Sequence, residues 1–271
     1  PKQLLMGVVA VAAVVVVMVV ALVTGAIQVD WLSNIVTAVA LVAAIYLWAQ
    51  MYTSKLVTRE EKNRLLGFIP MFVSGVLFFG IFQQQFTVMT IYSDVRLDRH
   101  MFGWEIPPSL VQSINPIFIV IFSAVFATMW TKLGDRQWST PVKFGVANIV
   151  IGISLFFFLP YSGAAANSTP MYVIILILFL FTMAELLLSP VGNALATKVA
   201  PVAFPSRMMA VWMMAVAMGT SLAGSLASFY DPDDAGAENT FFISLGVVSI
   251  VLGAILLVLS RWVVKKFSTF R

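Results

Sequence analysis

Residues 183–193 read Met-Ala-Glu-Leu-Leu-Leu-Ser-Pro-Val-Gly-Asn, in the middle of an apolar run that covers residues 170–198. About 20 apolar residues cross a bilayer as an α-helix, so this run predicts a transmembrane helix. Glu185 is the only acidic residue inside any long apolar run of the chain. A carboxylate at mid-membrane costs at least about 2.5–3.5 kcal/mol, and such residues usually face a polar cavity. Ser189 and Asn193 share its helix face, where we expect the function to lie.

The composition is that of an integral membrane protein. Hydrophobic residues make up 61% of the 271 residues and charged residues only 10%, and the mean hydropathy is +0.98. Average soluble domains carry about 25% charged residues. Most of the 16 Lys and Arg residues lie between apolar runs, so the net charge of +4 reflects membrane topology and does not indicate nucleic-acid binding.

Eight apolar runs are candidates for membrane spans. They cover residues 4–27, 33–53, 65–92, 107–131, 141–160, 170–198, 205–229 and 241–264. A short charged linker over residues 54–64 separates the first two from the other six. We therefore predict an all-α membrane protein with eight transmembrane helices. Residues 1–59 would form a peripheral hairpin, and residues 60–271 a six-helix bundle.

The basic residues indicate the orientation of these spans. With the N-terminus inside, 14 of the 16 Lys and Arg residues fall in inside segments, and only Arg96 and Arg99 fall outside. Cytoplasmic loops of membrane proteins carry such an excess of Lys and Arg. We therefore expect a multi-pass protein of the cell (inner) membrane, with both termini in the cytoplasm. The loop over residues 231–238 is acidic and would lie outside.

Other polar residues lie inside the predicted spans. Gln83, Gln84 and Gln85 are consecutive in the third span, where buried amides need partners, so they predict cavity lining or hydrogen bonds between helices. Asn115 precedes Pro116 in the fourth span, where it could satisfy a proline kink or offer its amide to a ligand.

Trp212 and Glu185 are the most informative polar residues of the seventh and sixth spans. Trp212 lies in a Met-rich seventh span, and its indole N–H needs an acceptor. Glu185 could be a structural carboxyl group, protonated or paired with another helix. No cation lies at mid-span to pair with it, so its counter-charge would come from a ligand, a proton or another chain.

Motifs of catalysis are missing from the sequence. It contains no Gly-x-Ser-x-Gly, His-Glu-x-x-His or Walker-type motif. It has no cysteine and one histidine, His100, which leaves no material for a thiolate or histidine metal site. We expect a protein that is not an enzyme and that binds neither a metal nor a cofactor.

Several motifs together resemble the C-terminal half of the proton-dependent oligopeptide transporter family, within the major facilitator superfamily. The motifs are Phe82-Gln-Gln84, Gln112-Ser-Ile-Asn-Pro116, Glu185-Leu-Leu-Leu-Ser-Pro-Val-Gly192 and Thr197-Lys-Val-Ala-Pro201. The resemblance covers residues 60–271, and the preceding hairpin resembles the two linker helices of bacterial members. It implies inward transport of di- and tripeptides with protons, by alternating access of two six-helix bundles.

The resemblance also implies roles for single residues. Glu185 would contact the peptide amino terminus with help from Asn115, and Trp212 would shape an aromatic side-chain pocket with Ser189 nearby. Many members carry a glutamate where this chain has Gln83, which cannot titrate. Proton coupling would then fall to Glu185 or to a residue elsewhere.

The N-terminal six-helix bundle of the family has no counterpart in this sequence. Half of a rocking transporter cannot alternate access, so the partner would be an N-terminal bundle in the same or a separate polypeptide. The alternative is a non-transporting accessory or structural subunit of a larger membrane complex, derived from such a transporter. A member that handles another small anion or drug-like solute is a further alternative.

Overall fold

The protein folds as a bundle of long α-helices. A computed structural model describes residues 17, 20, 24, 29–101 and 103–267. Its helices are α2 (Val29–Thr53), α3 (Arg59–Phe82), α4 (Val88–Val95), α5 (Pro108–Val111), α6 (Ile114–Leu133), α7 (Thr140–Leu155), α8 (Met171–Val199), α9 (Pro205–Ala227) and α10 (Ala235–Phe267). The 3₁₀ helices are η1 (Gln83–Phe86), η2 (Gly134–Arg136) and η3 (Phe156–Tyr161), and the strands β1 (His100–Met101) and β2 (Trp104–Glu105) pair antiparallel.

The predicted all-α membrane fold is confirmed. In the described part of the chain, seven helical segments are long and apolar enough to cross a membrane. They match the predicted spans from the second to the eighth. The first predicted span, residues 4–27, lies almost wholly outside the described residues. The division of the chain into a hairpin and a bundle at residue 59 stays a prediction.

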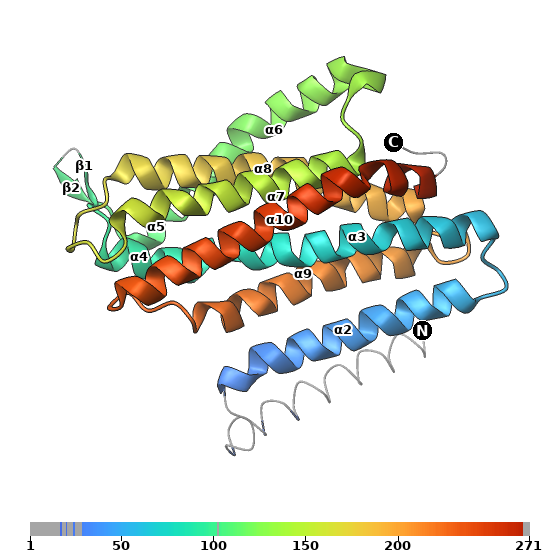
Figure 1. Ribbon diagram of the computed structural model, residues 1–271, viewed down its shortest axis with the longest axis horizontal. Helices are drawn as coiled ribbons and strands as arrows, with labels where there is room; N and C mark the ends of the chain where they lie inside the picture. The colour runs from blue at the N-terminus through green and yellow to red at the C-terminus, as the bar shows by residue number, and fades with distance from the viewer. Residues whose placement is uncertain (1–16, 18–19, 21–23, 25–28, 102, 268–271) are drawn as a thin grey trace.

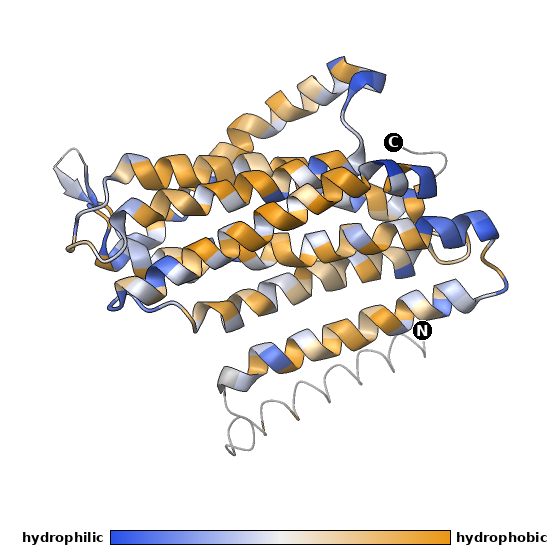
Figure 2. Ribbon diagram, viewed as in Figure 1, coloured by the Kyte–Doolittle hydropathy of each residue, from blue (hydrophilic) through white to orange (hydrophobic). Residues whose placement is uncertain are grey.

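The helices of the bundle lie along one long axis (Figure 1). Helix α10 packs against α7 and α3, α3 packs against α9, and α8 packs against α7. Helix α2 packs along α9 at the edge of the bundle, whereas α6 contacts α8 and diverges from the bundle toward its own C-terminal end (Figure 1). Apolar residues cover the middle of the helices, and hydrophilic residues gather at the two ends (Figure 2). This is the distribution that a bilayer requires.

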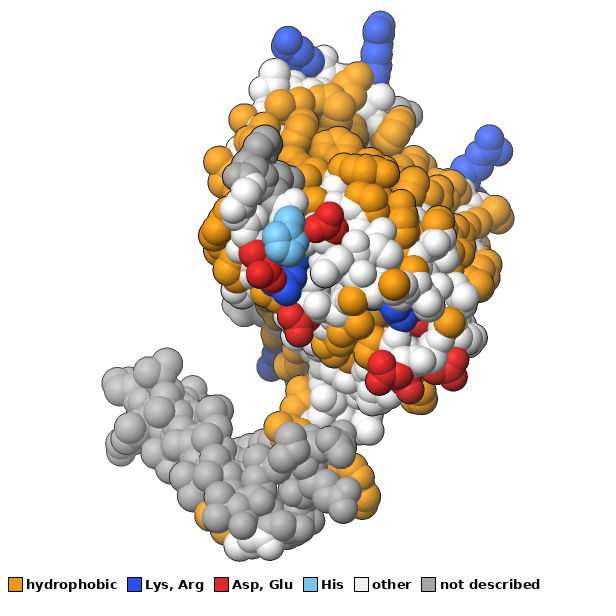
Figure 3. Space-filling view, turned by 90° about the vertical axis from the view of Figure 1, so that its left-hand side faces the viewer, with side chains coloured by type: hydrophobic (Ala, Val, Ile, Leu, Met, Phe, Trp, Pro, Cys, Tyr) orange, Lys and Arg blue, Asp and Glu red, His pale blue; other side chains and the backbone are white. Residues whose placement is uncertain are grey.

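The two ends of the bundle differ in charge. Figure 3 looks onto the end that carries the β1–β2 hairpin, where acidic side chains and the single histidine gather. The opposite end carries the last turns of α6, α8 and α10, which contain Lys132, Lys198, Lys265 and Lys266. The charge separation predicted from the sequence is therefore present along the axis of the bundle.

A hydrogen-bonded cap joins the start of α3 to the loop between α8 and α9. The Thr58 hydroxyl accepts from the Glu61 backbone N–H at 3.3 Å, and Glu61 Oε2 accepts from the Thr58 backbone N–H at 2.8 Å. This reciprocal pair is a capping box, which satisfies two free donors of the first helical turn. Glu61 Oε1 accepts from the Val202 backbone N–H at 2.8 Å. One carboxylate thus fixes both segments.

Two of the predicted spans are not single regular helices. The third predicted span is not one regular helix, because α3 ends at Phe82 and the chain passes through η1 before α4. The fourth span is divided into two helices, because α5 ends at Val111 and α6 starts at Ile114, so that Pro116 lies in the first turn of α6. Proline is tolerated there, since the first N–H groups of a helix have no intrahelical acceptor.

The predicted outer loop over residues 231–238 is shorter than expected. Helix α10 starts at Ala235, so Glu238 is a helical residue and its side chain is fully buried. Asp234 accepts from the Gly236 backbone N–H at 2.7 Å and so caps the start of the helix. The acidic stretch is therefore part loop and part helix N-terminus.

Candidate functional site

Glu185 and Asn115 come together where α8 packs against α6. Asn115 is the second residue of α6 and is 3% exposed. Its Nδ2 donates to Thr182 Oγ1 at 2.9 Å, and its side chain lies close enough to that of Glu185 to interact with it. Thr182 and Glu185 lie about one turn apart on α8, so the three side chains form one polar group between the two helices.

The Glu185 carboxylate keeps an unused acceptor. Its Oε2 atom is buried and has no hydrogen-bond partner in the described part of the chain. The ion pairs there join Arg96 to Glu238 and Arg99 to Asp94 and Glu105, and His100 Nδ1 lies 3.4 Å from Asp98 Oδ1. None of them includes Glu185. An uncompensated buried carboxylate is unfavourable in a membrane interior, so this group can gain greatly from a cationic ligand or a proton.

Ser189 and Asn193 continue the same face of α8 toward its C-terminal end. Ser189 is partly buried, and Asn193 is exposed. The Oδ1 atom of Asn193 accepts from the indole N–H of Trp212 at 2.8 Å. The sequence expectation that this indole needs an acceptor is confirmed. The bond also connects the candidate face of α8 to α9.

Trp212 is a packing residue in this structure. It is 1% exposed, and its ring contacts those of Phe68, Phe79 and Phe144. The ring lies directly against Gly192, where an added Cβ would be 2.1 Å from Trp212 Cζ2. The indole therefore occupies the centre of the contact between α3, α7, α8 and α9. A role in a side-chain pocket would require the ring to move from this position.

The three glutamines of η1 have different environments. Gln83 Nε2 donates to Thr220 Oγ1 of α9 at 3.0 Å. Gln84 Nε2 donates to the carbonyl oxygens of Gly80 at 3.1 Å and Ala223 at 3.2 Å. Gln85 is fully buried, and its side-chain amide has no hydrogen-bond partner in the described part of the chain. Gln83 and Gln84 thus join α9 to the α3–η1 segment. Of the two roles expected for the glutamines, cavity lining and hydrogen bonding between helices, these two residues have the second.

The candidate residues fall into two groups. Glu185 and Asn115 meet at the α6–α8 contact, with Ser189 one turn along α8. Gln83 and Trp212 lie at the contacts with α9 instead, and Trp212 bonds to Asn193, which is about two turns along α8 from Glu185. The sequence placed all five inside the membrane region but could not separate these groups.

A buried ion pair that the sequence did not predict lies at the other end of the bundle. Arg96 Nη2 and Glu238 Oε2 are 3.2 Å apart, and both side chains are nearly or fully buried. Glu238 also accepts from the Tyr230 hydroxyl at 3.0 Å and from the Gly163 backbone N–H at 2.9 Å. Burial and the adjacent carboxylate raise the pKa of Tyr230 well above its ordinary value, so Tyr230 stays a neutral donor.

This ion pair fixes the loops at that end. Arg96 also donates to the carbonyl oxygens of Ala164 and Pro232. It therefore joins the end of α4 to the η3–α8 and α9–α10 connections. One indication of this ion pair was present in the sequence: Arg96 is one of two basic residues in the predicted outside segments, which are rich in carboxylates.

Comparisons with known proteins give one consistent result. The POT family model matches residues 3–243. An uncharacterised transporter of Bacillus subtilis is 36% identical over 88% of this chain and 48% of its own length. A di-/tripeptide transporter of Lactococcus lactis subsp. cremoris is 35% identical over the same shares of the two chains.

Solved structures similar to this chain are transporters of the same family. A peptide transporter, POT, in complex with sulfate has a TM-score of 0.85 and 32% identity, covering 98% of this chain and 54% of the other. A POT family transporter in complex with 5-aminolevulinic acid has a TM-score of 0.83 and 34% identity, covering 97% and 54%. The chain spans about half the length of the curated relatives that it matches. It belongs to the POT family of transporters.

Proposed function

We propose that this chain is the C-terminal part of a proton-coupled symporter of di- and tripeptides. It would bind the amino terminus of the peptide and alternate access together with an N-terminal six-helix bundle, in the same or a separate polypeptide. Relatives named as di-/tripeptide transporters support the substrate class. The fact that the chain spans about half of their length supports the need for a second bundle.

The observation that best supports the proposal is that the Glu185 carboxylate lacks a counter-charge among the residues that the structure describes. A membrane-buried carboxylate with a free acceptor atom and no ion pair in the described residues requires a counter-charge. The ammonium group of a peptide amino terminus supplies a positive charge and three donors, and the interaction is strong where water is excluded. Asn115 would add a neutral hydrogen-bonding group next to it. A charged clamp of this kind is compatible with variable peptide side chains.

Glu185 is also our candidate for proton coupling within this chain. Gln83 cannot titrate, and it is engaged with Thr220. Because the carboxylate cannot hold a proton and pair with an ammonium at once, peptide binding would displace the proton from Glu185. In a symporter that proton would pass to another titratable group, which we place in the N-terminal bundle. We further propose that the protein lies in the cell membrane with both termini in the cytoplasm, as the distribution of basic residues favours.

Transport by the complete protein in liposomes tests this proposal. With an inward proton gradient, labelled dipeptide should accumulate, and Glu185→Gln should reduce the accumulation at least tenfold, about the loss of one charge-assisted bond. Glu60→Gln is the matched control, because Glu60 is exposed in the first turn of α3. Unchanged uptake by the Glu185 variant would contradict the assigned role. A complete protein that accumulates no peptide would favour the accessory subunit.

A further inference from the structure

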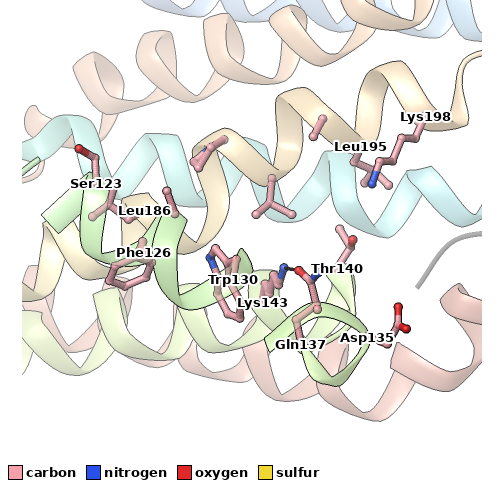
Figure 4. A pocket seen from close by; sticks show the side chains of 15 residues that line it. Ser123, Phe126, Trp130, Asp135, Gln137, Thr140, Lys143, Leu186, Leu195 and Lys198 are labelled. Carbon is pink, nitrogen blue, oxygen red and sulfur yellow. Dashed lines mark hydrogen bonds between the residues drawn. The ribbon is translucent and has the colours of Figure 1, made fainter. Parts of the chain in front are cut away.

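A cleft opens between α6 and the neighbouring helices α7 and α8, and it has no place in the transport proposal. Its volume is about 740 Å³, within the range of about 300–1,000 Å³ typical of small-molecule sites. Phe126, Trp130, Leu186 and Leu195 supply apolar walls, and Lys143 and Lys198 supply two ammonium groups. Figure 4 shows Lys143 beside Trp130 on one wall, with Lys198 and Leu195 on α8 across from them.

The cleft uses a different face of α8 from the candidate peptide site. Successive residues of an α-helix are 100° apart around its axis. Ser189 therefore lies about 40° from Glu185, whereas Pro190, Ala194 and Lys198 lie about 140–220° from it. The last three residues line the cleft, and neither Glu185 nor Ser189 does. The cleft is therefore centred on a face of α8 that points away from the Glu185 carboxylate, and Leu186 lies at the edge of the cleft nearest to Glu185.

Two positive charges share the cleft without an ion pair. Lys143 is 6% exposed, its Nζ donates to Gln137 Oε1 at 2.6 Å, and it lies 4.0 Å from the centroid of the Trp130 ring. Lys143 and Lys198 are close enough to repel each other. Within the described residues, no carboxylate lies within ion-pair distance of either lysine, although Asp135 lines the same cleft. An anionic ligand would relieve this repulsion.

The position of the cleft identifies the class of ligand. Lys143 is near the start of α7 and Lys198 is near the end of α8, at the end of the bundle that we predict to be cytoplasmic. That leaflet contains anionic lipids, and basic pockets between transmembrane helices on that side bind lipid head groups. The walls above the lysines are apolar, as an acyl chain requires. The indole N–H of Trp130 has no acceptor in the described part of the chain and lies on the same wall.

We propose that this cleft binds one anionic phospholipid, with its phosphate between Lys143 and Lys198 and an acyl chain along the apolar walls of α6 and α8. The bound lipid would fill the space where α6 diverges from the bundle. It would therefore stabilise the position of α6, which contacts the rest of the bundle chiefly through α8.

Native mass spectrometry of the full purified chain, titrated with phosphatidylglycerol, tests this proposal. Each basic residue near an anionic head group contributes about fivefold to affinity. The combined Lys143→Met and Lys198→Gln variant should therefore bind about 30-fold more weakly. Methionine at position 143 retains the apolar contact with Trp130. Lys198→Gln alone alters only an exposed side chain, and this single variant should lose about fivefold in lipid affinity. The combined Lys55→Gln and Arg59→Gln variant removes two exposed charges at the same end and should bind normally.

Ligand controls separate the alternatives. Phosphatidylcholine should bind at least tenfold more weakly, and neither glycerol phosphate nor a dipeptide should displace the bound lipid. Equal binding by the lysine variants, or equal binding of phosphatidylcholine, would overturn the proposal, because the charges would then play no part. Displacement by glycerol phosphate would indicate a site for free anions, and displacement by a dipeptide would assign the cleft to the transport path. Displacement by either compound would also overturn the proposal of a phospholipid site.

Discussion

Substitution of Gly192 by alanine should destabilise the protein strongly, because Trp212 already occupies the space of the new methyl group. An added Cβ would lie 2.1 Å from Cζ2 and 2.6 Å from Cη2 of the indole. Carbon atoms in contact are normally about 3.5–4.0 Å apart. The ring cannot retreat easily, since a Cβ at Gly75 would lie 2.8 Å from its Cζ3 atom, which places α3 close on another side.

The expected cost follows from this geometry. Overpacking of a filled core costs about 1–3 kcal/mol, and an overlap of this size belongs at the upper end. A shift of the ring would also break the bond between Trp212 Nε1 and Asn193 Oδ1, for about 1 kcal/mol more. Alanine also gains up to about 1 kcal/mol of helix propensity over glycine, so we expect Gly192→Ala to lower the free energy of unfolding by about 2–3 kcal/mol.

Unfolding of the purified protein in sodium dodecyl sulfate, followed by circular dichroism, measures this change. Gly80→Ala is the matched control, because the nearest atom to a Cβ at Gly80 is 3.6 Å away, which is an ordinary contact. Alanine there should leave stability unchanged or raise it by up to about 1 kcal/mol. Trp212→Phe removes the clashing atoms, so the cost of Gly192→Ala should fall by more than 1 kcal/mol in that background. Equal stability of Gly192→Ala and Gly80→Ala would refute the packing role of Trp212.

Three further predictions concern the ion pair, proton coupling and the missing bundle. Glu238→Gln should lower stability by about 3 kcal/mol, because it leaves Arg96 buried without a counter-charge. Tyr230→Phe should cost only about 1.5 kcal/mol, and detergent unfolding that gives equal losses would contradict the reading of the pair. Gln83→Glu should change the pH profile of uptake more than peptide affinity, because it adds a titratable group next to Thr220, and superimposable profiles would exclude a role in coupling. The chain expressed alone should insert in the membrane but accumulate no labelled dipeptide in liposomes, and gradient-driven accumulation would contradict the need for a second bundle.

Much of the fold could be predicted because each span is a separate signal along the chain. Twenty apolar residues suffice to indicate a helix, and the run over residues 170–198 matches α8 (Met171–Val199) within one residue at each end. The polar residues within the runs were likewise visible, and Asn115 and Glu185 do come together. Motifs that are compact in sequence carried the family assignment.

Features that depend on contacts between distant segments could not be predicted. The break at η1 goes with bonds from Gln84 to Ala223, which is 139 residues away, and an apolar run gives no sign of them. The pair of Arg96 and Glu238 joins residues 142 positions apart. Trp212 was visible as a residue that needs an acceptor, but its burial depends on Gly192 of another helix. Each of these is a tertiary effect that overrides the local pattern.

The central claim is that Glu185 binds the charged amino terminus of a peptide, and the affinities of two ligands test it directly. Binding of a dipeptide and of its N-acetylated form should be measured by calorimetry for the complete protein and its Glu185→Gln variant. We predict that the unmodified protein prefers the free amino terminus by at least about tenfold, and that the variant reduces this preference to about twofold or less. A variant that keeps the full preference for the free amino terminus would contradict the account, because the ammonium group would then be recognised elsewhere.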